Sequence, residues 1–169
     1  MEILFKNSYT RTKKVAKEFY RFHYFQRKSL LACYILVAIP FLADIVSAVL
    51  GQYYSIEVLI FVPLFGAMLF YSYCRQVNMM IKRDNEVHGK EIDVETIVTD
   101  SYIQGTASTG AVNRIEYKKI KNAVQTKNLI LLRSKANLIF IFDKNTFEIG
   151  SKEEFVSFLK ARGIKVKGK

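Results

Sequence analysis

The chain has 169 residues, with 26 Lys and Arg against 15 Asp and Glu, which gives a formal net charge of +11. No DNA- or RNA-reading motif accompanies this charge, so we expect no nucleic-acid partner. The excess of positive charge would instead attract the chain to anionic lipid headgroups. The two cysteines, Cys33 and Cys74, have no second ligand at metal-binding spacing, so the sequence predicts neither a metal site nor a cofactor.

Residues 1–28 combine a short strand with a basic amphipathic helix. Residues 2–9 fit a strand, and Thr10 or Thr12 precedes a helical pattern. The apolar and basic side chains of this helix fall on opposite sides: Val15, Phe19, Phe22, Phe25 and Gln26 on one, and Lys13, Lys14, Lys17, Arg21 and Lys28 on the other. Two placements fit equally: the helix lies in the headgroup layer, or its aromatic face packs on the C-terminal domain while its charges are solvated.

Residues 29–73 contain no Lys or Arg, and they predict a transmembrane helical hairpin. Two apolar runs, 29–50 and 56–73, each approach the roughly 20 residues that a spanning helix needs, and the short connection 51–55 makes them antiparallel. The alternative is a helical pair buried in a soluble core. Pro40 and Pro63 argue against it, since membrane helices accept proline better. Both flanks are basic, so we expect two spans of the cell (cytoplasmic) membrane with both termini cytoplasmic.

Asp44 and Glu57 are the acidic residues of the hairpin, and both fall toward its outer end. A carboxylate within a span is costly, so each needs a reason. One hypothesis is an acidic spot on the outer face that meets a cation, a proton or a cationic peptide. The other is structural: Asp44 faces the partner helix or is protonated, and Glu57 reaches water.

Residues 84–169 predict a cytoplasmic β domain, with the polar segment 84–89 as its boundary. Strand patterns recur at short intervals, over residues 92–98, 102–104, 111–115, 120–126, 129–132 and 138–142. Ser151 and Glu154 form a capping box before a helix whose apolar face is Phe155, Phe158 and Leu159, and Gly163 ends it. The predicted fold is therefore membrane α+β: a transmembrane hairpin, then an antiparallel sheet or barrel closed by a C-terminal helix.

The order of these elements resembles the YcxB-like family of bacterial membrane proteins. The resemblance covers most of the chain and is most specific over residues 115–160, which include Ile115-Glu-Tyr-Lys-Lys-Ile120 and Phe147-Glu-Ile-Gly-Ser151-Lys-Glu-Glu-Phe155. It implies two membrane spans and a cytoplasmic domain similar to a pleckstrin-homology (PH) barrel, and it transfers no functional residues. Tyr117 departs from the family pattern, which often has Trp there.

No catalytic constellation can be assembled from the sequence. The two histidines, His23 and His88, lie in no triad or metal pattern. Gly105 and Gly110 have the spacing of a phosphate-binding loop, but Ala111 stands where that loop has its Lys, so we interpret the segment as a strand connection. We therefore expect no enzymatic activity.

The function that these patterns predict is a non-enzymatic, membrane-anchored interaction module that binds a protein partner or anionic lipid. Its candidate contacts are basic: Lys14, Lys17, Arg21, Lys82, Arg83, Lys118, Lys119 and Lys121. One alternative is an immunity protein against a membrane-active bacteriocin or toxin, with Asp44 and Glu57 facing a cationic peptide. Another is a subunit of a larger membrane assembly or oligomer, with small residues at 43–47 and 66–67 allowing close helix approach.

Overall fold

The computed structural model describes residues 2–25, 28–53, 56–89, 91–136 and 138–168, and the chain in it divides into two compact units. One unit, called here the β unit, comprises Met1–Glu18 and Ile81–Lys169. The other, the helical unit, comprises Phe19–Met80. The β unit is therefore built from two separate pieces of sequence.

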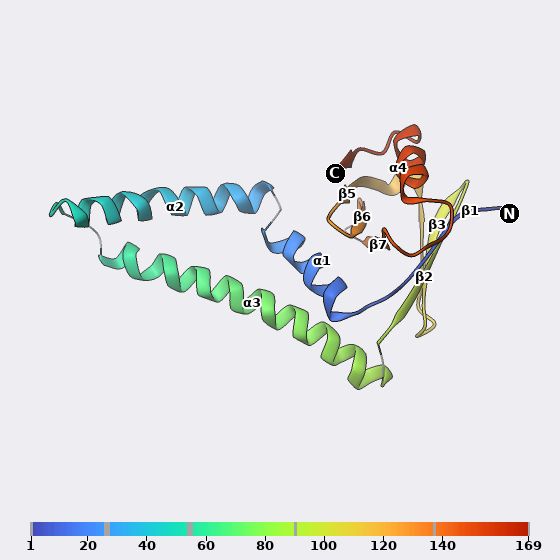
Figure 1. The fold of residues 1–169 in the computed structure, drawn as a ribbon, viewed down its shortest axis with the longest axis horizontal. Coiled ribbons are helices and arrows are strands. Elements are labelled where there is room, and N and C mark those ends of the chain that lie inside the picture. The colour runs from blue at the N-terminus through green and yellow to red at the C-terminus, as the bar shows by residue number, and fades with distance from the viewer. Residues whose placement is uncertain (1, 26–27, 54–55, 90, 137, 169) are drawn as a thin grey trace. The chain divides into compact units, whose positions relative to one another are not determined.

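The larger sheet of the β unit, sheet A, has the strand order β4-β3-β2-β1-β8 (Figure 1). Its strands are β1 (Ile3–Thr10), β2 (Asp93–Thr99), β3 (Tyr102–Ala107), β4 (Val112–Glu116) and β8 (Phe147–Ile149). All of its pairings are antiparallel, and β1 pairs with β2 from Ile3 opposite Thr99 to Thr10 opposite Asp93. The strand that sequence analysis assigned to a separate segment, 1–28, thus lies inside the C-terminal domain.

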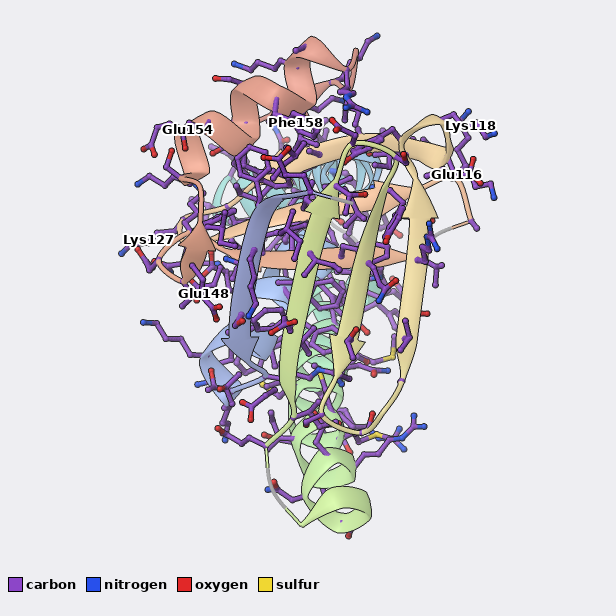
Figure 2. All side chains as sticks on the ribbon, turned by 90° about the vertical axis from the view of Figure 1, so that its right-hand side faces the viewer. Glu116, Lys118, Lys127, Glu148, Glu154 and Phe158 are labelled. Atoms are coloured by element: carbon purple, nitrogen blue, oxygen red, sulfur yellow. The ribbon has the colours of Figure 1, made fainter. Side chains whose placement is uncertain are left out.

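The smaller sheet, sheet B, has the order β7-β6-β5-β9. It consists of β5 (Ile120–Gln125), β6 (Leu129–Ser134), β7 (Ile139–Asp143) and β9 (Val166–Lys167), and the short helix η1 (Tyr117–Lys119) leads into it from β4. The pairing of β9 with β5 is parallel and the other two are antiparallel. In Figure 2 the strands of sheet B cross behind those of sheet A, and α4 (Lys152–Ala161) lies across one end.

One hydrophobic core joins the two sheets to α4. Sheet A contributes Phe5, Val98, Ile103 and Ile115, sheet B contributes Ile120, Ala123, Ile130, Leu132, Phe140 and Phe142, and α4 contributes Phe155 and Leu159. The Phe155 ring lies at the centre, 4.6 Å from the Phe142 ring and 5.3 Å from the Phe5 ring between centroids. The prediction of antiparallel sheets closed by a C-terminal helix is confirmed.

The predicted signals of α4 are also confirmed. The Ser151 hydroxyl accepts a hydrogen bond from the Glu154 N–H at 3.2 Å, and a Glu154 carboxylate oxygen accepts one from the Ser151 N–H at 2.8 Å. Gly163 follows the helix with a φ of 74°, a left-handed conformation that favours glycine. Just before Gly163, Arg162 stacks on the rings of Tyr117 and Phe158 at the end of α4.

The remaining helices are α1 (Lys13–Phe25), α2 (Lys28–Val49) and α3 (Ile56–His88) (Figure 1). Thr12 caps α1 by accepting a hydrogen bond from the Val15 N–H at 3.4 Å. α3 continues to His88, so most of the segment 84–89 that was expected to be a domain boundary is helical, as are Arg75, Lys82 and Arg83. The apolar run thus ends within a helix whose last turns are polar and charged.

Candidate functional site

The helical unit exposes large apolar side chains along α2 and α3. Leu36 is 70% exposed and Phe61 is 67% exposed, although both are hydrophobic. The same holds for a series along both helices: Ile35, Ile39, Leu42, Val46 and Val49 of α2, and Ile56, Ile60, Leu64, Met68 and Phe70 of α3. Within the described residues, one helix, Ile56–Glu86, is long and apolar enough to cross a membrane, and Tyr34–Val49 is a shorter apolar helix.

The two acidic residues of the predicted hairpin lie on different helices. Asp44 is half-buried in α2, and Glu57 is exposed in the first turn of α3. A carboxylate in the first turn of a helix is favoured by the positive end of the helix dipole, so Glu57 has a structural reason for its place. The geometry shows no ligand-binding arrangement that unites the two side chains.

Three of the predicted basic contacts form ion pairs with glutamates. Lys118 and Lys119 both pair with Glu116, at 2.8 and 3.5 Å, and Figure 2 labels Glu116 and Lys118. Lys82 pairs with Glu86 at 3.4 Å. These exposed pairs contribute little stability, but they cancel much of the charge that was expected to attract a partner. The other predicted contacts, Lys14, Lys17, Arg21, Arg83 and Lys121, are exposed.

Glu18 of α1 forms hydrogen bonds to the turn between β5 and β6, a contact that the sequence analysis did not predict. Its carboxylate accepts hydrogen bonds from the N–H and Nδ2 of Asn128, both at 2.7 Å, and from the hydroxyl of Thr126 at 2.5 Å. Desolvation raises the pKa of Glu18, but the hydrogen bonds from Asn128 and Thr126 outweigh it, so the pKa lies below its usual value. The first turns of α1 are thereby fixed to sheet B.

The segment that joins β1 to α1 is bound to the segment that joins α3 to β2. The Thr10 hydroxyl donates a hydrogen bond to Asp93 at 2.7 Å, and the Arg11 N–H donates to the carbonyl of Ile92 at 2.8 Å. Arg11 also lies 3.5 Å from Asp84, which is only 6% exposed. Because a buried carboxylate depends on its partner, Arg11 and Asp84 hold the start of α1 to the end of α3.

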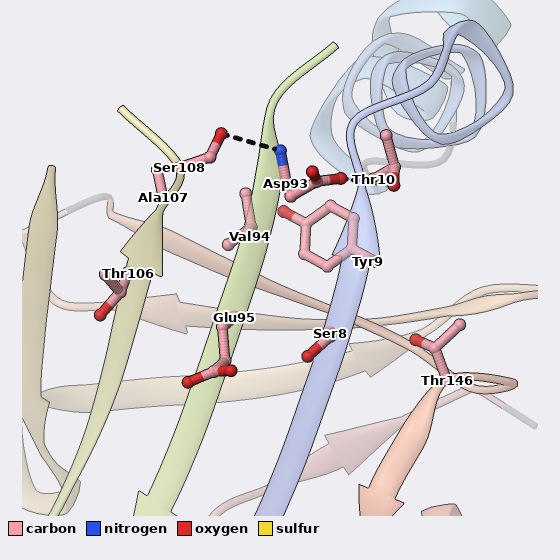
Figure 3. A pocket seen from close by; sticks show the side chains of 10 residues that line it. All are labelled: Ser8, Tyr9, Thr10, Asp93, Val94, Glu95, Thr106, Ala107, Ser108 and Thr146. Carbon is pink, nitrogen blue, oxygen red and sulfur yellow. Dashed lines mark hydrogen bonds between the residues drawn. The ribbon is translucent and has the colours of Figure 1, made fainter. Parts of the chain in front are cut away.

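An open hollow of about 540 Å³ lies on sheet A, beside the end of β1 and the start of β2 (Figure 3). Eight of the ten residues that line it carry a hydroxyl or a carboxylate: Ser8, Tyr9, Thr10, Asp93, Glu95, Thr106, Ser108 and Thr146. Asp93 is engaged by Thr10, and its N–H donates to the Ser108 hydroxyl at 3.2 Å. Burial raises the pKa of Tyr9 to about 12, which keeps its phenol protonated and unsuited to act as a base at neutral pH.

Comparison of the chain with family models, curated proteins and solved structures gave no match. Within the described ranges, no group of three or more His, Cys, Asp or Glu side chains could hold a metal ion. The exposed apolar helices and the surface charge of the β unit are features that can carry a function.

Proposed function

We propose that the protein is a non-enzymatic, membrane-anchored interaction module of the YcxB-like type, in which a helical hairpin carries a PH-like domain at the inner surface of the cell membrane. The observation that carries the proposal is the exposure of apolar side chains along α2 and α3. Soluble monomers rarely expose apolar patches of more than a few hundred Å². A bilayer would cover these side chains, whereas water would not.

The lengths of the two helices suit a bilayer. At about 1.5 Å per residue, the 22 residues of α2 extend about 33 Å, close to the hydrocarbon thickness of about 30 Å. The 33 residues of α3 extend about 50 Å, so its last dozen residues would lie beyond the hydrocarbon. These residues include Lys82, Arg83 and Glu86, whose charges suit water.

Strand pairing constrains the number of crossings. β1 precedes the two helices and β2 follows them, yet the two strands pair along their whole length in one sheet. Both ends of the helical segment must therefore lie on the same side of any membrane that it enters. If α3 crosses the bilayer, α2 must cross it too, which supports two spans rather than one.

Cysteine accessibility tests this topology in intact cells that express the full chain. With Cys33 and Cys74 changed to Ser, we expect a membrane-impermeant maleimide to label a Gln52→Cys variant in the α2–α3 connection. The matched control, Ser101→Cys in the exposed β2–β3 turn, should be labelled only after the cells are opened. Equal labelling of both positions in intact cells, or recovery of the chain in the supernatant after alkaline washing, would contradict the proposal.

A further inference from the structure

The two sheets of the β unit carry opposite net charge. The strands of sheet A hold two basic residues, Lys6 and Arg114, and four acidic ones, Asp93, Glu95, Glu116 and Glu148. The strands of sheet B hold three basic residues, Lys121, Arg133 and Lys167, and one acidic residue, Asp143. Residues 117–142 and 155–169, which supply most of sheet B, contain no Asp or Glu. The domain is therefore electrically polarised, with sheet B positive.

Four exposed lysines form a strip along the β5–β9 side of sheet B. The members of this lysine strip are Lys121, Lys127, Lys165 and Lys167. Val166 packs against the core and lies opposite the buried Ala123, so its neighbours Lys165 and Lys167 point outward. The chain then passes so close to the Gln125 carbonyl that a Cβ on Gly168 would lie 2.4 Å from it, which brings β9 alongside the end of β5 just before Lys127.

Five other surface lysines differ from the strip because ion pairs compensate their charges. Lys6, Lys82, Lys118, Lys119 and Lys152 each form an ion pair with a glutamate. Within the part of the chain that the structure describes, no member of the strip forms an ion pair. Its positive potential therefore remains free to act on an external partner.

A short length of chain connects the residue that binds the strip's turn to the start of α2. The turn that holds Lys127 is bound on both sides by Glu18, through Thr126 and Asn128. Lys28, where α2 begins, lies ten positions after Glu18. Ten residues reach at most about 35 Å even when fully extended. A chain anchored through α2 would thus keep Lys127 within a short distance of the headgroups, at high effective concentration.

We propose that the lysine strip docks on the anionic headgroups of the membrane that holds the chain, an inference that rests on the proposed membrane anchoring. Each lysine near an anionic surface strengthens attraction by about 1 kcal/mol, or roughly fivefold in the docking equilibrium. The acidic sheet A would be turned away from the same surface by repulsion. Docking would orient the domain and leave the open hollow of sheet A accessible from the cytoplasm.

Lysine reactivity in nanodiscs tests the proposal with the full chain. The chain is placed in discs of phosphatidylcholine alone or of phosphatidylcholine with phosphatidylglycerol, and each lysine is acetylated and quantified by mass spectrometry. We expect the four strip lysines to react several-fold more slowly in the anionic discs, while Lys6, Lys118 and Lys119 react equally in both. At about 1 M salt, where the Debye length falls to about 3 Å, the difference should disappear.

Substitution separates docking from a general effect of the anionic surface. The change K121Q/K127Q/K165Q/K167Q should abolish the difference in domain melting temperature between the two kinds of disc, whereas K82Q/K118Q/K119Q/K152Q, which removes the same charge from paired positions, should preserve it. Equal strip reactivity in both discs, or equal slowing of every surface lysine, would overturn the inference. Slowing of the strip by single-stranded DNA but not by phosphatidylglycerol would overturn it in favour of a nucleic-acid partner. A chain that does not enter the discs at all would refute the membrane anchoring itself.

Discussion

The β unit and the helical unit use the same kinds of apolar side chain in opposite ways. In the β unit, Phe155, Leu159 and Ile130 are fully buried among residues from two sheets and a helix. In the helical unit, Leu36, Phe61 and other side chains of the same types face outward. This difference supports the proposal that the two units face different solvents, the β unit water and the helical unit a medium as apolar as its own surface.

The prolines follow the same division. Both prolines of the chain, Pro40 and Pro63, lie inside α2 and α3. Proline within a helix removes a hydrogen bond and costs about 3 kcal/mol in water, because its ring also clashes with the preceding turn. Two such residues within two helices that have little core to support them would be difficult to explain for a soluble protein. Membrane helices accept them more readily.

Truncation of a matched pair of phenylalanines gives the largest expected effect. Phe155→Ala removes the central ring of the core, so we expect it to lower the free energy of unfolding of the β unit by about 3–5 kcal/mol. Phe61→Ala removes an exposed ring of α3, so the stability of the β unit should change by less than about 0.5 kcal/mol. Hydrogen exchange of the β-unit amides, with the chain in nanodiscs, measures both. Similar losses for the two variants would contradict the division into two units.

Local patterns in the sequence predicted much of the β unit. The strands from β2 to β7 appear within a few residues of their expected positions, because alternating or continuous apolar runs mark a strand directly. The capping box at Ser151 was also predictable from the sequence, since it depends on residues only three positions apart. The segment from Gly105 to Gly110, expected to be a strand connection, is the end of β3 and the turn before β4.

Features that depend on distant residues could not be predicted. The pairing of β1 with β2 joins residues 83 to 96 positions apart, from Thr10 opposite Asp93 to Ile3 opposite Thr99, and the composition of neither segment indicates its partner. The contact between Glu18 and Asn128 crosses 110 residues and was hidden because Glu18 falls within a run of basic residues. The continuation of α3 to His88 was missed because its polar end was interpreted as a domain boundary, although polar residues also suit a solvated helix.

Glu18 gives the next largest effect, because it joins α1 to the β unit. Glu18→Gln keeps the shape of the side chain but replaces an acceptor with a donor that faces the donors of Asn128 and Thr126. We expect a loss of about 1–3 kcal/mol in the free energy of unfolding. The control is Glu153→Gln on exposed α4, whose pair with Lys152 should contribute little. Equal losses would show that Glu18 acts only as surface charge.

The same residue predicts a pH dependence. The pKa of Glu18 is lowered in the folded chain, with desolvation opposing the hydrogen bonds from Asn128 and Thr126 that lower it. Its stabilising effect is therefore present above the unfolded pKa of about 4.3 and is lost as the pH falls through the folded pKa. Between about pH 5 and pH 3, the original chain should lose more stability than Glu18→Gln, because the variant has no carboxylate to protonate. Parallel pH profiles from chemical denaturation would refute this.

The smallest expected effect concerns α4, the helix that closes the core of the β unit. A helix of ten residues is too short to be stable alone in water, so packing of Phe155 and Leu159 must hold it, and the cap contributes only at its end. Ser151→Ala removes the hydroxyl that accepts the Glu154 N–H bond, and we expect a loss of about 1 kcal/mol. Ser157→Ala in the exposed middle of the helix removes no cap and should be neutral or slightly stabilising, because alanine favours helix more than serine. Hydrogen-exchange rates of the amides in the first turn of α4 should rise in Ser151→Ala alone. A loss of stability comparable to that of Phe155→Ala would mean that the cap, and not the core, determines whether α4 closes the domain.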